Sequence, residues 1–183
     1  MAPILLTGFD PFGRWTVNSS WQAVQAICRA DIVKACLPVD HDKAAARVTH
    51  LIAELRPRAV LLTGLASTPA LRLETLARRG VLDRSGPNLR RGRWDFAAAR
   101  RRIAAQGLPA RLSSHAGAYV CDTTYWAALG SPAAFVAFLH VPPLGPSWRA
   151  GRIANGISAM LDCLPQEARR PDLHTKIMRP KRA

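Results

Sequence analysis

The stretch AAFVAFLHVPP, residues 133–143, has the composition of a buried β-strand that ends at a pair of prolines. Two more short apolar runs, PILLT at residues 3–7 and AVLLTG at residues 59–64, have the same character. Continuous apolar runs of this length are typical of parallel strands that are covered on both faces. The three segments therefore predict the centre of a largely parallel sheet.

Helix-like segments alternate with these strands. Ser19 and Gln22 resemble a capping box, and Asp40 can cap the next helix. The first of these helices would carry four apolar residues on one face: Trp21, Val24, Ile27 and Cys28. Further helices are expected at residues 94–106 and 123–129 and around Ile153, Ile157, Met160 and Leu161, and further strands at residues 31–37, 70–77 and 109–114. The alternation predicts an α/β fold, a largely parallel sheet flanked by helices.

The length and composition are typical of one soluble domain. The chain has 183 residues, of which 49% are hydrophobic. We expect a single domain over residues 1–165 and a loosely ordered, basic tail over residues 166–183. The first apolar run is too short for a signal peptide, and no run is long enough to cross a bilayer, so we expect a cytoplasmic protein without a membrane partner.

The cysteines and the charge argue against two kinds of site. Cys28, Cys36, Cys121 and Cys163 show no C-x-x-C spacing, so reduced thiols without a metal are expected. The net charge of +14 raises the question of nucleic-acid binding. The sequence has no zinc-finger spacing, no basic zipper and no alternation of aromatic with basic residues, so solvated charge is the preferred interpretation.

The predicted fold indicates where a site should lie. In open α/β sheets, ligands bind beyond the carboxyl ends of the strands. Four segments are expected at that edge: TGFDPFG (7–13), TGLAS (63–67), HAGAYVC (115–121) and His140.

Cys121 is the candidate nucleophile. A cysteine at a helix start ionises more readily, because free N–H groups and the helix dipole favour negative charge. A thiol nucleophile also needs a base and an orienting partner. His140 ends a buried strand at the expected edge and is a better base than His115, and Glu74 interrupts an apolar strand where a charge is costly unless it is paired. From these residues alone, Cys121 as a small apolar filler stays an alternative.

The loop TGFDPFG has the glycine spacing of a phosphate-binding loop but lacks its chemistry. Arg14 and Trp15 stand where such a loop needs Lys followed by Ser or Thr. Phe9 and Phe12 would fill the space that a phosphate requires. We interpret these two rings as an apolar pocket wall, with plain core residues as the alternative.

Taken together, the motifs resemble those of pyroglutamyl peptidase I, the cysteine peptidases that remove an N-terminal pyroglutamyl residue. The resemblance rests on LLTGFDPFG with Asn18 and Trp21, on AGAYVC and FLHVP, and on Glu74 between them. It implies a three-layer α/β/α sandwich of the phosphorylase/hydrolase-like kind, assembly as a homo-oligomer (dimer or tetramer), no cofactor, and peptide substrates with a blocked N-terminus.

The resemblance also assigns roles to individual residues. Glu74, Cys121 and His140 match the catalytic triad, in which the thiolate attacks, the imidazole moves the proton and the carboxylate orients it. Arg84 matches an arginine that, with the backbone N–H of Cys121, binds the oxyanion. The expected substrate contacts are Phe9, Phe12, Asn18, Leu65 and Tyr119.

Some residues depart from the family pattern. Leu65 stands where glutamine is usual, and Asp122 stands where asparagine normally follows the cysteine, which should raise the pKa of the thiol. The segment after Arg84 is short and rich in arginine. Three interpretations follow: a pyroglutamyl peptidase, a divergent cysteine hydrolase of the same fold that acts on another small amide, or a non-enzymatic basic binding protein.

Overall fold

A six-stranded mixed sheet forms the middle of the fold in the computed structural model, which describes residues 2–79, 89–117 and 119–164. The strand order is β2-β1-β3-β8-β4-β7. Four strands are parallel: β1 (Ile4–Phe9), β2 (Ile32–Leu37), β3 (Ala59–Leu65) and β8 (Phe135–Val141). Two run the opposite way: β4 (Leu71–Glu74) and β7 (Ala110–Ser113). The largely parallel sheet predicted from the sequence is confirmed, with two strands reversed.

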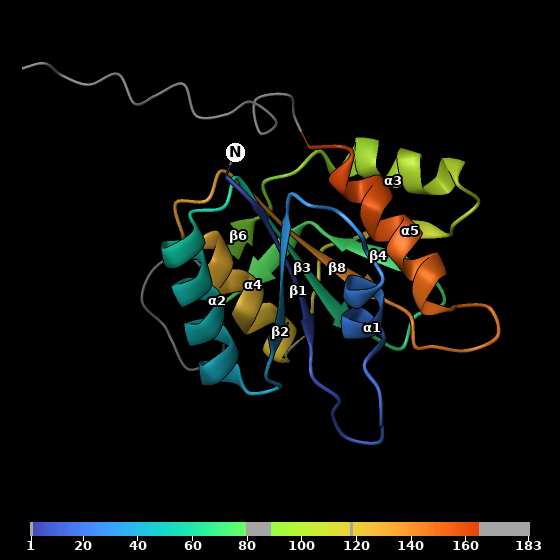
Figure 1. Cartoon of the computed structure of the whole chain (residues 1–183), viewed down its shortest axis with the longest axis horizontal. Helices are drawn as coiled ribbons and strands as arrows, with labels where there is room; N and C mark the ends of the chain where they lie inside the picture. The colour runs from blue at the N-terminus through green and yellow to red at the C-terminus, as the bar shows by residue number, and fades with distance from the viewer. Residues whose placement is uncertain (1, 80–88, 118, 165–183) are drawn as a thin grey trace, which may run out of the picture.

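Helices cover both faces of this sheet (Figure 1). One face packs against α1 (Ser19–Gln25), α3 (Phe96–Ala105) and α5 (Ala150–Leu161), and the other against α2 (His41–Leu55) and α4 (Val120–Leu129). Alternate strand residues supply the two cores: Leu61 and Leu139 belong to the first, and Leu62 and Phe138 to the second. The α/β/α sandwich is therefore confirmed.

The predicted strand at residues 70–77 and the first predicted helix differ in the structure. The run at residues 70–77 is two strands, because β4 joins the main sheet whereas β5 (Leu76–Arg78) pairs with β6 (Leu89–Arg91) in a separate two-stranded sheet. The cap of α1 is Asn18 rather than Ser19, since the Asn18 side chain accepts a hydrogen bond from the Ser20 backbone N–H. The helix ends at Gln25, so Cys28 lies beyond it and is exposed.

The start of α4 is the difference that bears most on function. Its first residue is Val120, three positions before the predicted start, so Cys121 lies inside the first turn. The N-cap residue, Tyr119, makes no side-chain capping bond. The Asp122 backbone N–H donates to the Tyr119 carbonyl at 3.0 Å, whereas among the described residues the Cys121 N–H has no acceptor and stays available to a ligand.

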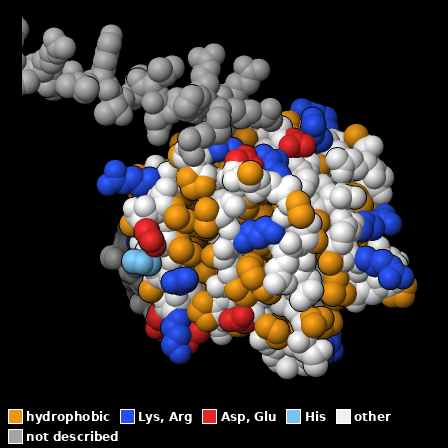
Figure 2. Space-filling model, viewed as in Figure 1, with side chains coloured by type: hydrophobic (Ala, Val, Ile, Leu, Met, Phe, Trp, Pro, Cys, Tyr) orange, Lys and Arg blue, Asp and Glu red, His pale blue; other side chains and the backbone are white. Residues whose placement is uncertain are grey.

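The basic residues do not form one continuous surface on the face seen in Figure 2. Lys and Arg side chains are scattered there among hydrophobic and polar ones. Across the described ranges, none of the helices combines the length and apolar character that crossing a bilayer requires. The predicted tail at residues 166–183 and the candidate residue Arg84 lie outside the described residues.

Candidate active site

A pocket of about 580 Å³ lies at the carboxyl ends of β1, β3 and β8, and the four predicted segments all contribute to its lining. Phe9, Leu65 and His140 come from these three strands, as expected. The segment at residues 115–121 arrives differently. Its strand, β7, runs antiparallel to β8, so its carboxyl end faces the opposite edge of the sheet. Residues 115–117 nevertheless reach the pocket before α4 begins.

Glu74 and His140 form a buried hydrogen-bonded pair beside the pocket. His140 Nδ1 lies 2.8 Å from Glu74 Oε1, and the Glu74 side chain is fully buried. A carboxylate oxygen can only accept, so Nδ1 carries the proton and donates it. In the neutral imidazole the other ring nitrogen, Nε2, is then an acceptor. This is the arrangement that a general base requires.

Two further residues fix Glu74. Arg72 donates from Nε and Nη2 to Oε1, at 3.1 and 3.0 Å, and the Tyr125 hydroxyl donates to the Glu74 backbone carbonyl at 3.0 Å. Burial alone would raise the pKa of Glu74, but the hydrogen bond to His140 and the charge of Arg72 outweigh it, and the pKa is lowered. Glu74 is therefore ionised at neutral pH.

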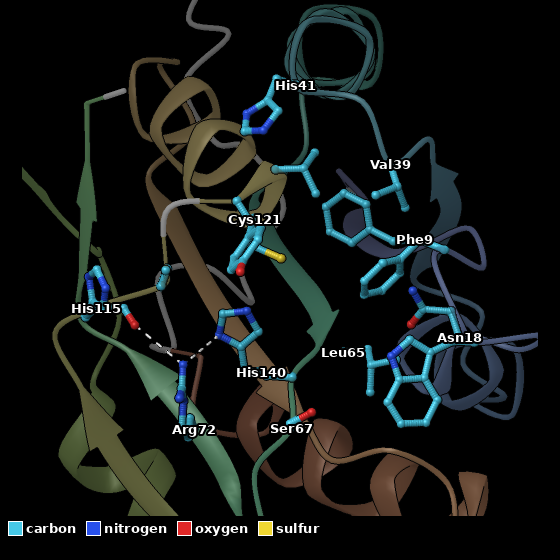
Figure 3. A pocket seen from close by; sticks show the side chains of 17 residues that line it. Phe9, Asn18, Val39, His41, Leu65, Ser67, Arg72, His115, Cys121 and His140 are labelled. Carbon is cyan, nitrogen blue, oxygen red and sulfur yellow. Dashed lines mark hydrogen bonds between the residues drawn. The ribbon is translucent and has the colours of Figure 1, made fainter. Parts of the chain in front are cut away.

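Cys121 projects from the first turn of α4 into the same pocket (Figure 3). Space for its sulfur depends on Gly64 of β3, because a Cβ at that position would lie 2.9 Å from Cys121 Sγ and 2.9 Å from Phe138 Cζ. Gly64 is directly opposite His140 in the β3–β8 register, so the thiol and the imidazole are held over neighbouring strands. Within the described part of the chain, no hydrogen bond joins the thiol to His140.

The prediction that Cys121 ionises readily at a helix start is wrong, because the pKa of its thiol is raised and not lowered. Burial, together with the charges of Glu74 and Asp122, raises the pKa of Cys121 to about 12. Desolvation therefore outweighs the helix start. The thiol is neutral at rest, and a base must take its proton when it reacts.

Asp122 affects this thiol from outside the pocket. Its Oδ1 accepts a hydrogen bond from the Arg78 backbone N–H at 2.9 Å, which ties α4 to β5. Burial raises the pKa of the Asp122 carboxyl, and the bond from Arg78 opposes that rise. The expectation that Asp122 raises the thiol pKa is supported in direction.

All five predicted substrate contacts line the pocket. Phe9 is buried in the core and also lines the pocket, so both of its interpretations hold, whereas Phe12 is exposed at the rim. Leu65 is nearly buried, and Tyr119 is largely exposed. Asn18 also lines the pocket, but its side chain is already bonded to the Asp10 carbonyl and to Ser20.

Three residues in or beside the pocket were not singled out from the sequence. Arg72 shares a face with Glu74, and the two-residue period of a strand could have revealed it. The sequence gives no sign that Gly64 matters, because its role depends on the Cys121 and Phe138 side chains that pack against it in the fold. His41 begins α2 and bonds to Thr123 Oγ1 at 2.8 Å, which links the two helices on this face. No group of His, Cys, Asp and Glu in the described ranges could hold a metal ion.

Comparisons with known proteins agree with this geometry. A sequence model described as pyroglutamyl peptidase matches residues 2–79. Pyroglutamyl-peptidase 1 of Homo sapiens is 29% identical, over 89% of this chain and 91% of that protein. The pyrrolidone-carboxylate peptidase of Deinococcus radiodurans is 35% identical, over 78% of each chain.

Solved structures extend the likeness to three dimensions. The crystal structure of the pyrrolidone carboxyl peptidase from Thermus thermophilus has a TM-score of 0.81 and 29% identity, covering 88% of this chain and all of that one (100%). The likeness therefore extends over most of the chain. By its sequence and its fold, this chain belongs to the pyroglutamyl peptidase family.

Proposed function

We propose that this protein hydrolyses the amide bond between an N-terminal pyroglutamyl residue and the rest of a peptide, with Cys121 as nucleophile. The observation that carries the proposal is the 2.8 Å bond between His140 Nδ1 and Glu74 Oε1, next to a pocket that also holds the Cys121 thiol. Family membership supports the same reaction.

The proposed reaction forms a thioester with Cys121 and then hydrolyses it, with His140 moving the proton in each step. His140 Nε2 takes the thiol proton as Sγ attacks the scissile carbonyl carbon, and the tetrahedral oxyanion collapses as the imidazolium gives that proton to the leaving amine. Water then attacks the thioester with His140 again as base, and the acid and the free thiol are released. Glu74 holds the imidazole and stabilises its charged form. Because the resting thiol is neutral, proton transfer and attack are coupled.

The oxyanion requires hydrogen-bond donors at the nucleophile. The backbone N–H of Cys121 lies in the first turn of α4 and has no intrahelical acceptor, which supports its assignment as one donor. Arg84 stays a candidate for the second donor on its sequence position alone.

The test is turnover of a fluorogenic pyroglutamyl amide by the wild type and by Cys121→Ala, with Cys28→Ser as a matched control. We expect turnover by the wild type and the control, and none by Cys121→Ala. If the wild type leaves this substrate intact while substrate-sized amides slow alkylation of Cys121, the result favours a hydrolase of another small amide. If neither occurs, the enzymatic proposal fails.

We also propose that the chain assembles as a homo-oligomer. Strand β2 is at one edge of the main sheet, and its Ile32 and Val33 are only half-buried in the single chain. An edge of this kind offers unpaired backbone groups and apolar area to a second copy. Light scattering coupled to size exclusion measures the mass directly, and a mass of 19.9 kDa would contradict the proposal.

A further inference from the structure

The pocket has two chemically different ends, with the reacting groups between them. Figure 3 shows Phe9, Val39 and Leu65 on one side, Arg72 and His115 on the other, and Cys121 and His140 in the middle. The flat, neutral lactam fits the apolar side. With the scissile carbonyl at Cys121, the residue that leaves would extend toward Arg72 and His115.

Arg72 has hydrogen-bonding capacity to spare at that end. Its Nε and Nη2 donate to Glu74, and Nη2 also reaches the His115 carbonyl at 3.4 Å. Nη2 lies 3.5 Å from His140 Nδ1, but that nitrogen already donates to Glu74, so this is a contact and not a hydrogen bond. Among the described residues no acceptor bonds Nη1. The Arg72 side chain is 28% exposed, so a ligand can reach it.

The surroundings of Arg72 are short of negative charge. Arg111 is its register partner on β7, so the two side chains leave the sheet on the same face. Like charges placed side by side on a sheet are destabilising unless an anion lies near. Glu74 is the neutralising group, but His140 shares its Oε1, and none of the residues that line the pocket is acidic.

The pocket also has room for more than the ring. Its volume, about 580 Å³, is in the range of about 300–1,000 Å³ that holds a drug-sized ligand. A single five-membered lactam leaves much of that space unused, and the unused part includes the cationic end.

We propose that Arg72 is a specificity residue that selects substrates whose leaving residue carries a carboxylate next to the scissile amide. This inference rests on the proposed function of the same pocket. The carboxylate could be the free C-terminus of a pyroglutamyl dipeptide or an acidic side chain in a longer peptide. Both would accept charge-assisted hydrogen bonds from the guanidinium.

The experiment compares kcat/KM for pyroglutamyl-alanine, pyroglutamyl-alanine amide and pyroglutamyl-glutamate amide. We expect one or both of the acidic substrates to exceed the neutral amide by about tenfold or more, as a charge-assisted hydrogen bond permits. A preference for the first alone identifies the terminal carboxylate, and one for the third alone identifies the side chain. The preference should shrink as ionic strength rises.

Arg72→Gln should bring the three kcat/KM values together, whatever its effect on overall rate, because Arg72 also contacts Glu74. Arg101→Gln, an exposed arginine on α3 across the sheet, removes the same charge and should keep the preference. If Arg72→Gln does not fold, the wild-type comparison and its salt dependence decide. Equal rates on all three substrates overturn this inference and leave the proposed function standing, whereas no turnover of any of them overturns both.

Discussion

His140 Nδ1 bonds to Glu74 Oε1 at 2.8 Å although the two residues are not direct partners in the sheet. Strand β4 is antiparallel to β8, Arg72 lies opposite His140, and Glu74 lies opposite Phe138, so the bond is a diagonal one across the ladder. The same oxygen accepts from Arg72. One carboxylate oxygen thus positions both the imidazole proposed as the base and the guanidinium proposed to bind the substrate carboxylate.

Replacing Glu74 by glutamine should cut kcat by on the order of 10³- to 10⁴-fold, because the amide no longer enforces a proton on Nδ1 or stabilises the imidazolium. Steady-state kinetics on a pyroglutamyl amide measures this. A loss of less than tenfold would contradict the role of Glu74.

The same variant tests the acid stability of the fold. The folded protein lowers the pKa of Glu74 from its ordinary 4.5, so its carboxylate stabilises the fold above that pH and loses this contribution as the pH falls through the folded pKa. Urea unfolding between pH 6 and 3 should show a smaller fall in the free energy of unfolding for Glu74→Gln than for the wild type. Parallel curves would contradict the lowered pKa.

Cys121 should react slowly with iodoacetamide at neutral pH in the protein without ligand. Its pKa is raised to about 12 by burial, so the thiolate is scarce and its rate of alkylation should rise about tenfold per pH unit through the measurable range. Mass spectrometry of digested protein gives the rate at each cysteine, and the exposed Cys28 serves as the internal reference. Faster labelling of Cys121 than of Cys28 at pH 7 would show a thiolate at rest.

Asp122→Asn should speed that alkylation by roughly two- to tenfold, because it removes a negative charge next to the thiol. The asparagine oxygen can still accept from the Arg78 backbone N–H, so α4 should keep its position. Asp42→Asn on α2 is the matched control and should leave the rate unchanged. A rate equal to the wild type would mean that the charge of Asp122 does not reach Cys121.

Gly64→Ala should lower activity more than tenfold. The new methyl carbon would lie 2.9 Å from the Cys121 sulfur and 2.9 Å from the Phe138 ring, so at least one of them would have to move. We expect a loss of about 1–3 kcal/mol in the free energy of unfolding as well. Gly151→Ala is the control, because its Cβ would meet nothing within 4 Å at the start of α5. Kinetics and urea unfolding of both variants measure the two effects, and wild-type activity in Gly64→Ala would show that the site has room to spare.

The Arg72–Glu74 segment could be predicted only in part from the sequence. Its alternation identified a strand and marked Glu74 as a charge that needs a partner, but not that His140 and Arg72 share its Oε1. The same alternation predicted one strand where the structure has β4 and β5, because two strands in different sheets can share a continuous alternating pattern along the chain. Hydrogen-bond partners across a sheet are set by strand order, which local pattern does not contain.

The sequence by itself determined the alternation of strands and helices and the identity of the candidate triad, because periodicity and motif order are properties of the chain. Only the tertiary structure decided that β4 and β7 run against the other strands, that Gly64 makes room for the Cys121 sulfur, and that this thiol is neutral at rest. Each of these depends on which atoms from distant segments exclude water from one another, and that is a property of packing.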